Sequence, residues 1–501
     1  MNLTELMSPA APSGPAASPG AIRAPPLADP EIVGLTADSR QVRPGFLFAA
    51  LRGAQQDGRA FAAEAVAKGA VAILTDDRAA LNLDAEARRH IAIIADPNPH
   101  RRLALLAARF YPRQPETIAA VTGTNGKTSV VHFTRGIWAA LGHLAASLGT
   151  LGQVSPAGRR AGALTTPDPV ALQRDLAELA AQGVEHVAIE ASSHGLAQYR
   201  LDGVAVAAAA FTNLTRDHLD YHGDMASYRA AKQRLFAELL APDGTAILNA
   251  DSPEFAGLAM LCRERGQRVI AFGIAAEAEL CLLARTPSRD GQRISLALFG
   301  ETREIDLPLV GEFQAMNVLA ALGLAVASGT PVSDAADILS RLSGVPGRMQ
   351  RVGETASGAV VFVDYAHTPD ALASVLAALR PHADRQLAVV FGAGGDRDRG
   401  KRPLMGRVAV ELADLVYVTD DNPRGEAPAE IRRAILAAAP HAVEIGDRGE
   451  AIATAVAGLR RGDILVIAGK GHETGQIIGG TVLPFDDALV ARDAIAAAGG
   501  G

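Results

Sequence analysis

The stretch that most constrains the fold of this chain is Ala119–Ser129 (AAVTGTNGKTS), where a strand, a glycine turn and the start of a helix follow one another. The apolar run Thr117–Val121 is rich in β-branched residues, which is typical of a buried strand. Beyond the glycines, apolar residues recur at helical spacing over residues 130–141. The chain is therefore expected to pass from a buried strand through a tight turn into a helix.

A strand, glycine turn and helix N-terminus of this kind form a cradle for phosphate. Backbone N–H groups of Gly123–Ser129 and the positive end of the helix dipole would face an anion, and Lys127 adds a point charge. The hydroxyl of Thr128 is placed to bind Mg²⁺. The pattern GxxGKT is shorter than the usual GxxxxGKT, because position 121 is Val. We predict a nucleoside triphosphate site.

Composition narrows the class of protein further. The 501 residues suggest about three domains, and 49% hydrophobic with 21% charged residues is ordinary for a soluble globular protein. The net charge of −7 gives no reason to expect nucleic acid or an anionic membrane as a partner. Cys262 and Cys281 form neither a disulfide framework nor a zinc pattern, and we find no apolar run of roughly 18 residues and no signal-peptide pattern. We expect a soluble cytoplasmic protein without membrane insertion.

Changes in composition divide the chain into four segments. Residues 1–30 are expected to be a flexible leader, since Ser8–Pro30 is dominated by Pro, Ala, Gly and Ser. Residues 31–115 read as a small α/β domain, and residues 116–345 and 346–501 as two larger ones in which helices alternate with short apolar strands. Such alternation favours a mostly parallel, doubly wound sheet with ligands at the carboxyl ends of its strands. We expect strands at Val71–Thr75, Ile91–Ile94, Val187–Ile189, Ala205–Phe211, Ala246–Leu248, Val269–Phe272, Val360–Val363, Leu387–Phe391, Leu415–Val418 and Ile464–Ile467.

Polar side chains follow two of the central strands. Glu190 comes directly after Val187–Ile189, and a carboxylate there could hold Mg²⁺, which prefers oxygen ligands; it could also simply face solvent. His218 lies in the polar, aromatic-rich loop after Ala205–Phe211. Spacing alone leaves open whether His218 is a metal ligand or a structural partner.

One lysine of the expected helix Met225–Leu240 allows two interpretations. Lys232 lies on or beside the apolar stripe, between Tyr228 and Phe236 at four-residue spacing. Usually such a lysine reaches along the apolar surface to water. If its amine is desolvated, its pKa falls, and the neutral amine can react with CO₂ to give a carbamate, an anionic oxygen ligand for a second Mg²⁺. The residues alone leave both interpretations open.

In the C-terminal segment, charged and amide side chains stand just past several expected strand ends. They are Arg397, Asn422, Arg424 and Glu473. Guanidinium groups recognise carboxylates in a bidentate manner, while a carboxylate and an amide can receive an ammonium group. One cleft could gather these groups around a zwitterionic amino acid; the alternative is that they are solvated surface charges.

Nine motifs in fixed order carry a resemblance to a known family. They are TGTNGKTS, EASSHGL, DHLDYHG, AAKQRLF, PGRMQ, VDYAHTPDAL, FGAGGDRDRGKRPLM, DNPR and GKGHE. Together they resemble the Mur ligases, in the type that adds 2,6-diaminopimelate, from about Asp38 to about Asp486. The resemblance implies a UDP-sugar domain, a central P-loop ATPase domain and a C-terminal Rossmann-like domain for the incoming amino acid. It also implies ATP-dependent formation of an amide in peptidoglycan synthesis, through an acyl phosphate.

The resemblance implies roles for individual residues. Contacts to UDP-N-acetylmuramoyl-L-alanyl-D-glutamate would come from Asp38, Ser39, Ala54, Gln55, Gln56, Thr165, Thr166, Ser192, Gln198 and Arg200. ATP would be held by Gly123, Thr124, Asn125, Gly126, Lys127, Thr128 and Ser129, with Asn317, Arg348 and Asp364 around its adenosine. Two magnesium ions would be bound by Thr128, Glu190, His218 and Lys232 as N6-carboxylysine, and Lys127, Lys232 and His218 would act in catalysis. The meso-diaminopimelate pocket would comprise Arg397, Asp421, Asn422, Pro423, Arg424, Gly469 and Glu473.

Three alternative functions differ in the motifs that they require. A lysine-adding Mur ligase is disfavoured by the DNPR stretch, because lysine lacks the second carboxylate and would leave Arg424 buried and unpaired. The related folylpolyglutamate synthases are disfavoured by DNPR and by the N-terminal DSR, PG and LF residues. A nucleotide-binding scaffold without catalysis is disfavoured by the presence of Lys127, Thr128, Glu190 and Lys232. We expect a monomer whose partners are its three substrates.

Overall fold

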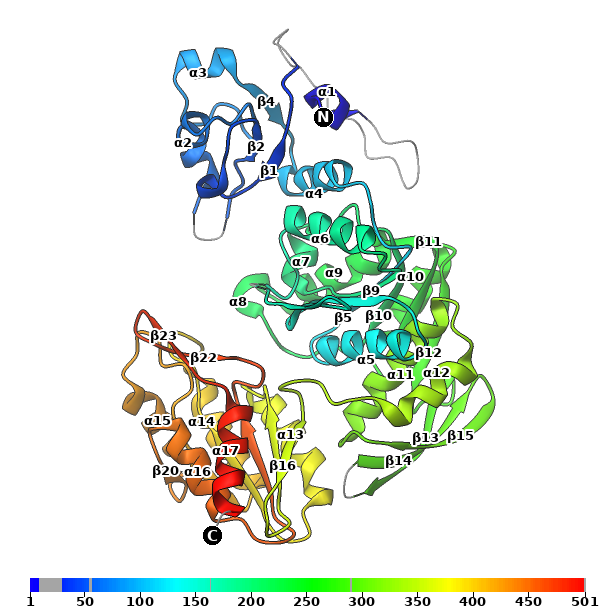
Figure 1. The fold of residues 1–501 in the computed structure, drawn as a ribbon, viewed down its shortest axis with the longest axis vertical. Helices are drawn as coiled ribbons and strands as arrows, with labels where there is room; N and C mark the ends of the chain where they lie inside the picture. Colours follow the sequence, from blue (N-terminus) through cyan, green and yellow to red (C-terminus); the bar gives the residue numbers. More distant parts are fainter. Residues whose placement is uncertain (9–28, 54–55, 163, 289–290, 500–501) are drawn as a thin grey trace. The chain divides into compact units, whose positions relative to one another are not determined.

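The computed structural model (Figure 1) describes residues 1–8, 29–53, 56–162, 164–288 and 291–499. The chain divides into two compact units. Unit 1 comprises Met1–Ala278 and Ala320–Ala335, and unit 2 comprises Glu279–Leu319 and Ala336–Gly501. The fold is α/β, with mostly parallel sheets in an N-terminal, a central and a C-terminal domain. In the described ranges, no helix has the length and apolar character needed to cross a bilayer.

The N-terminal domain is a four-stranded parallel sheet in the order β1-β2-β3-β4. Its strands and helices are β1 (Gly34–Thr36), β2 (Phe46–Ala49), α2 (Ala62–Ala67), β3 (Ala72–Thr75), α3 (Ala85–His90), β4 (Ala92–Ala95) and α4 (Pro99–Phe110), with 3₁₀ turns at Ser39–Gln41 and Gly58–Phe61. Asn98 caps α4 and Pro99 occupies its first turn, two features that favour a helix start. The predicted strands Val71–Thr75 and Ile91–Ile94 are confirmed to within a residue or two.

The expected flexible leader over residues 1–30 needs correction at its start. Leu3–Met7 form helix α1, and Leu3, Leu6 and Met7 are buried in the core of the N-terminal domain. Asn2 pairs with Glu31, and the guanidinium of Arg109 donates to the carbonyl oxygen of Leu6 at 2.6 Å. Apolar side chains that fill the domain's core hold this segment in place. The Pro- and Ala-rich residues 9–28 lie outside the described ranges.

The central domain carries the predicted strand, glycine turn and helix at the middle of its sheet. In unit 1 the neighbouring strands run β12-β11-β10-β5-β9-β6-β7-β8, parallel except for the last two. The elements are β5 (Thr117–Thr122), α5 (Lys127–Ala140), β6 (Ala145–Gly149), β7 (Gly152–Ser155), β8 (Gly158–Arg160), α6 (Pro169–Ala181), β9 (His186–Glu190), α7 (Ser193–Ala197), β10 (Val206–Phe211), α8 (Leu219–His222), α9 (Met225–Arg234), β11 (Leu240–Asn249), α10 (Phe255–Glu264) and β12 (Arg268–Gly273).

Two parts of the central segment differ from the prediction. The helix expected over Met225–Leu240 is regular only to Arg234, widens into a π-helical turn over Leu235–Leu239 and passes directly into β11. Residues 280–307 form antiparallel strands instead of continuing the parallel alternation: β13 (Leu280–Ser288), β14 (Gly291–Leu298) and β15 (Glu301–Leu307). Helices α11 (Glu312–Ala327) and α12 (Val332–Ile338) and a 3₁₀ turn at Leu339–Arg341 follow.

The C-terminal domain is a doubly wound sheet in the order β16-β17-β21-β18-β19-β20. Its elements are β16 (Gln350–Glu354), β17 (Val360–Asp364), α13 (Pro369–Leu379), a 3₁₀ turn (Arg380–His382), β18 (Leu387–Phe391), α14 (Lys401–Leu412), β19 (Leu415–Val418), α15 (Pro428–Leu436), β20 (Val443–Glu444), α16 (Arg448–Ala457), β21 (Ile464–Ala468), the hairpin β22 (Gly475–Ile478) and β23 (Thr481–Pro484), and α17 (Asp487–Gly499). Apolar residues of α13, α14 and α15 form one core with the sheet, and those of α16 and α17 form another.

A fully buried ion pair ties α16 and α17 to the strand ends of this sheet. Both side chains of the Arg448–Asp487 pair are 0% exposed, with Nη2 and Oδ2 at 2.7 Å. Arg448 Nη2 also donates to the carbonyl oxygen of Ala468 at 3.0 Å, at the end of β21. The guanidinium therefore satisfies backbone acceptors at the strand end where predicted site residues follow.

Removing one member of this pair should strongly destabilise the C-terminal domain. Asp487→Ala leaves the Arg448 guanidinium buried without its counter-charge, and we expect a loss of about 3–5 kcal/mol in the free energy of unfolding, measured by urea unfolding. Glu430→Ala is the matched control, because it breaks the exposed Arg433–Glu430 pair and should cost less than about 1 kcal/mol. Equal losses in the two variants would contradict this account.

Candidate functional site

The glycine turn between β5 and α5 has a backbone that requires glycine. Gly126 caps α5 with φ +90°, a left-handed conformation, and Gly123 has φ +146°. A Cβ on Gly123 would lie 1.9 Å from Thr212 Oγ1, so no larger residue fits there. The loop thus lies tightly against the end of β10, and the N-terminus of α5 begins directly after it.

Residues just after β10 brace the loop. The backbone N–H of Thr124 donates to the carbonyl oxygen of Asn213, and that of Asn125 donates to Asn213 Oδ1, each at 2.9 Å. Thr212 Oγ1 donates to the carbonyl oxygen of Asn125 at 2.6 Å. Asn213 was not predicted as a site residue, because its position after a strand was the only signal that the sequence offered.

Two lysines meet at one backbone oxygen of the loop. Lys127 Nζ donates to the carbonyl oxygens of Gly123 at 3.0 Å and Thr124 at 2.8 Å, and Lys232 Nζ donates to the same Gly123 oxygen at 2.7 Å. Lys232 is 1% exposed, and its Nζ lies 4.4 Å from the ring centroid of Tyr228. Burial, and after it the charge of Lys127, lowers the pKa of Lys232 to about 6. The structure therefore supports the interpretation in which the Lys232 amine is desolvated, and not the one in which it reaches water.

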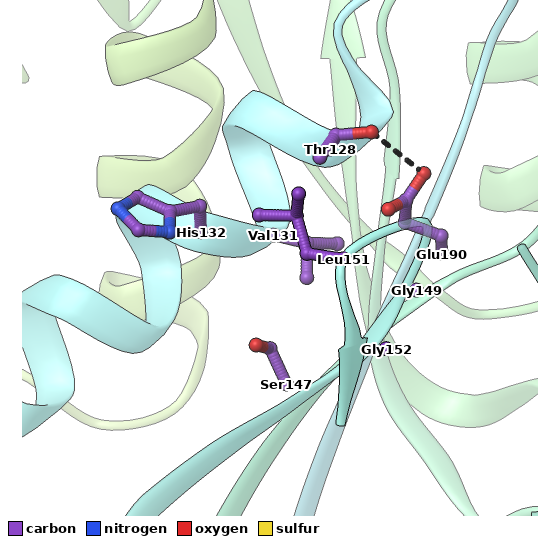
Figure 2. A pocket seen from close by; sticks show the side chains of 8 residues that line it. All are labelled: Thr128, Val131, His132, Ser147, Gly149, Leu151, Gly152 and Glu190. Carbon is purple, nitrogen blue, oxygen red and sulfur yellow. Dashed lines mark hydrogen bonds between the residues drawn. The ribbon is translucent and has the colours of Figure 1, made fainter. Parts of the chain in front are cut away.

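Thr128 and Glu190 come together across the start of α5 and the end of β9. Thr128 Oγ1 donates to Glu190 Oε2 at 3.0 Å, and Thr150 donates to the same carboxylate through its N–H at 2.7 Å and its hydroxyl at 3.1 Å. Glu190 is 1% exposed, so the interpretation of a solvent-facing carboxylate is wrong. Figure 2 shows the Thr128–Glu190 hydrogen bond among the residues that line a small pocket, with His132 on the opposite side of the group.

A set of hydroxyl, amide and guanidinium groups adjoins Glu190. Thr166 Oγ1 lies 2.7 Å from the Glu190 carbonyl oxygen and 2.9 Å from Ser192 Oγ, and Arg200 Nη1 donates to the carbonyl oxygen of Thr166 at 2.7 Å. Thr165 Oγ1 lies 3.2 Å from Thr150 Oγ1, and Gln198 accepts from the Arg200 guanidinium. The structure thus brings together five residues that the resemblance assigned to one substrate: Thr165, Thr166, Ser192, Gln198 and Arg200.

His218 lies at the start of α8 in a left-handed conformation, with φ +51°. Its ring is 47% exposed, its Nε2 lies 3.4 Å from Asp217 Oδ2, and its ring centroid lies 4.8 Å from that of His194. Among the described residues, the His, Cys, Asp and Glu side chains close enough to share one ion are a different set, His143, Glu185 and His186. The magnesium role of His218 stays a prediction.

The remaining predicted sugar-site residues lie in turns and loops of the N-terminal domain. Asp38 caps the turn Ser39–Gln41 by accepting from the N–H of Arg40 at 2.9 Å, and its hydrogen bond from the Arg40 side chain lowers the pKa of the carboxyl. Ser39 is buried, and its carbonyl oxygen accepts from Lys68 Nζ at 3.0 Å. Gln56 is exposed, while the predicted Ala54 and Gln55 lie outside the described residues.

Three residues assigned to the adenosine lie in unit 2. Arg348 stacks on the ring of Tyr365, with 4.2 Å from its guanidinium carbon to the ring centroid. Asp364 accepts from the N–H groups of Met349 at 2.7 Å and Ala366 at 2.8 Å, and burial raises the pKa of its carboxyl. Asn317, on α11, donates to Gln314. The Arg348 and Asp364 contacts connect the segment before β16 to the residues just after β17.

At the strand ends of the C-terminal sheet, three polar side chains form a connected network. Asn422 Nδ2 donates to Glu473 Oε2 at 2.8 Å, and Lys470 Nζ donates to Asn422 Oδ1 at 3.0 Å and to Glu473 Oε2 at 3.2 Å. Lys470 is 0% exposed, and sequence reasoning gave it no role. Its position between two glycines directly after a strand, in GKGHE, is the sequence signal that could have identified Lys470 as a site residue.

The two predicted arginines meet at a glycine beside this network. A Cβ on Gly394 would lie 2.7 Å from Arg424 Nη1 and 3.7 Å from Arg397 Cγ. Arg424 has φ +50° and donates to the carbonyl oxygen of Gly395 at 3.0 Å, while Arg397 is exposed. The other predicted pocket residues, Asp421, Pro423 and Gly469, are packed at the same strand ends: a Cβ on Gly469 would lie 2.6 Å from Asp421 Oδ2, and one on Gly395 would lie 1.9 Å from the Pro423 oxygen.

Three family models match the chain in succession. Residues 31–111 match the catalytic domain of the Mur ligase family, residues 121–325 the Mur ligase middle domain, and residues 347–471 the Mur ligase glutamate ligase domain. The first range contains β1–β4, the second covers the central sheet from within β5 onward, and the third contains β16–β21.

Individual relatives extend over nearly the whole chain. A UDP-N-acetylmuramoyl-L-alanyl-D-glutamate–2,6-diaminopimelate ligase from Bradyrhizobium diazoefficiens is 54% identical over 477 residues, which cover 95% of this chain and 96% of that protein. A solved structure of a ligase with the same name has a TM-score of 0.71 and 34% identity, covering 99% of both chains. Folylpolyglutamate synthase from Mycobacterium tuberculosis, complexed with ADP and AMPPCP, has a TM-score of 0.63 at 20% identity over 79% of this chain and 94% of its own, which shows a likeness of fold alone. The chain belongs to the Mur ligase family.

Proposed function

We propose that this chain is the ATP-dependent ligase that joins meso-2,6-diaminopimelate to the D-glutamate of UDP-N-acetylmuramoyl-L-alanyl-D-glutamate in peptidoglycan synthesis. The observation that carries the proposal is the near full-length match to relatives named for this reaction. The polar network at the C-terminal strand ends supports the choice of amino acid, because it offers groups for both a carboxylate and an ammonium.

The proposed reaction has two steps. The γ-carboxylate of D-glutamate attacks the γ-phosphorus of ATP, the bond to the leaving ADP oxygen breaks, and an acyl phosphate forms. The free amine of diaminopimelate then attacks the acyl carbon, the bond to phosphate oxygen breaks, and the amine loses a proton. Lys127, at the start of α5, is proposed to offset the charge on the transferring phosphoryl group, while Gly123–Ser129 hold the phosphates.

The donors around Glu190 fit magnesium. Thr128 and Glu190 supply a hydroxyl and a carboxylate within 3.0 Å of each other, and hard cations prefer such oxygen ligands. We propose that these two residues, His218 and carbamylated Lys232 hold two Mg²⁺ ions. Bound Mg²⁺ neutralises charge on phosphate oxygens.

A carbamate on Lys232 requires a neutral amine. The low pKa of this buried amine supplies it at neutral pH, and attack of Nζ on CO₂ with loss of one proton gives the N-carboxylate. We propose that this carboxylate presents anionic oxygens to the metal site.

The amino-acid pocket is proposed at the C-terminal strand ends. Arg424 and Asn422 would recognise the distal amino-acid centre of diaminopimelate, with Arg397, Gly469 and Glu473 completing the pocket beside Asp421 and Pro423. The buried Lys470 holds Asn422 and Glu473 in place through hydrogen bonds to both side chains. Lysine lacks the distal carboxylate, so it would leave the Arg424 guanidinium unpaired.

The other assignments complete the proposal. Asp38, Ser39, Gln56, Thr165, Thr166, Ser192, Gln198 and Arg200, together with Ala54 and Gln55, contact the UDP-sugar dipeptide, and Asn317, Arg348 and Asp364 contact adenosine. We propose domains at 31–115, 116–345 and 346–501, and a monomer that acts in the cytoplasm on small-molecule substrates without nucleic acid.

Phosphate release from ATP tests the reaction. With UDP-N-acetylmuramoyl-L-alanyl-D-glutamate present, we expect release with meso-diaminopimelate and not with L-lysine, and Lys127→Ala should abolish it while leaving binding of the UDP-sugar intact. Release with L-lysine alone would keep a Mur ligase and discard the pocket. No phosphate release with either acceptor, or full activity in Lys127→Ala, would contradict the proposal.

Arg424 tests the specificity. Arg424→Ala removes one charge-assisted contact worth about 1.5–3 kcal/mol, so KM for meso-diaminopimelate should rise roughly 10- to 150-fold while KM for ATP is unchanged. Arg433→Ala, at an exposed site on α15, is the matched control and should leave both constants unchanged. If KM for meso-diaminopimelate stays at the wild-type value in Arg424→Ala, Arg424 does not contact the amino acid.

The pH dependence of stability tests the buried amine. In CO₂-free buffer, between about pH 6 and pH 10.5, the unfolded chain holds a proton on Lys232 that the folded chain has lost. The free energy of unfolding should therefore rise with pH across this window, and Lys232→Met should lack that increment. Urea unfolding of both proteins at several pH values measures it. Parallel profiles would show that the folded chain keeps the lysine protonated.

A further inference from the structure

A histidine, a glutamate and a second histidine lie together at the amino-terminal end of β9, away from the groups used above. His143, from the turn between α5 and β6, has Nδ1 at 3.3 Å from Glu185 Oε2. His186 Nδ1 lies 3.9 Å from the same oxygen, and the ligand atoms of all three residues lie within 4.8 Å of one another. The two imidazole rings are 4.5 Å apart between centroids.

The inner histidine has an unused nitrogen. His186 is 11% exposed, and its buried Nδ1 has no hydrogen-bond partner. A buried polar atom without a partner is rare in native proteins and calls for an explanation such as an ion. Burial, and after it the neighbouring His143, lowers the pKa of His186.

We propose that His143, Glu185 and His186 bind a zinc-class divalent cation, which joins the turn after α5 to the start of β9. This goes beyond the proposed ligase function and does not depend on it.

The donor set and spacing favour this class of ion. Two imidazole nitrogens and one carboxylate oxygen suit zinc and its late first-row neighbours, whereas Mg²⁺ prefers oxygen ligands alone. Ligands about 2.0–2.1 Å from a tetrahedral ion lie about 3.3 Å apart, and the His143–Glu185 distance already has this value. His143 and Glu185 are 38% and 49% exposed, so both side chains can move the remaining distance, and water can fill the fourth position.

The site is separate from the candidate active site. His186 and Glu190 are the first and last residues of β9, so they lie about 13 Å apart along the strand. Zinc at the His143 site therefore has no contact with the Glu190 carboxylate, and occupancy can be read without any assay of turnover.

The only tryptophan of the chain reports on this site. Trp138, on α5, has its ring centroid 5.0 Å from that of His186. Paramagnetic Co²⁺ and Ni²⁺ quench indole emission at such short range, so tryptophan fluorescence measures binding directly.

The experiment titrates untagged full-length protein with Co²⁺ in an excess of Mg²⁺, which occupies oxygen-donor sites. We expect saturable loss of most of the Trp138 emission with one equivalent, the visible absorption of tetrahedral Co²⁺, and recovery of the emission when Zn²⁺ displaces Co²⁺. His143→Ala and Glu185→Gln, both at half-exposed positions, should weaken binding at least about tenfold, since even outer partners of metal ligands cost about 10–100-fold.

A matched variant separates this site from general histidine binding. His441→Ala removes an exposed histidine of unit 2 and should titrate like wild type. If wild type shows no saturable quenching, or if His143→Ala and Glu185→Gln quench like wild type, the proposal is overturned. Circular dichroism of each variant confirms that it is folded, and phosphate release, measured separately, reports only on the ligase proposal.

Discussion

The carbonyl oxygen of Gly123 receives hydrogen bonds from the amino groups of two lysines, and much of the central site depends on that contact. Lys127 reaches it from the start of α5, and Lys232 reaches it from α9 through the protein interior. Gly123 can present this oxygen because its φ of +146° and its lack of a Cβ let it lie against Thr212. One backbone atom thus fixes the loop, holds a desolvated amine and draws α9 toward the end of β5.

The C-terminal domain uses the same principle with different groups. Lys470 is buried under Asn422 and Glu473 and holds both in one orientation, while Arg448, paired with Asp487, satisfies the backbone oxygen at the end of β21. Buried cations at strand ends are costly unless they are fully paired. Here they are paired with groups that belong to the proposed pocket or support it, so stability and substrate recognition depend on the same contacts.

The two ends of strand β9 carry different sets of potential metal ligands. At its carboxyl end Glu190, Thr128 and Thr150 offer oxygen atoms, and at its amino end His186 stands with His143 and Glu185. Oxygen donors suit a hard ion that accompanies phosphates, whereas imidazole donors suit zinc. The two sets of ligands therefore favour different ions.

The sequence by itself determined the strand–turn–helix at Thr117–Ala140, the parallel alternation and the polar residues after each strand, since these follow from local periodicity and from glycine's freedom of φ. It did not determine the fate of Leu3–Met7, the antiparallel strands over 280–307 or the end of α9 at Arg234, because burial against distant residues overrides local propensity there. Lys232 shows the limit most clearly: its spacing allowed a solvated or a buried amine. Tertiary packing decided this, as it decided that His143 would meet His186 from 43 positions away. Desolvation and side-chain distance are properties of the folded surroundings, and no local pattern encodes them.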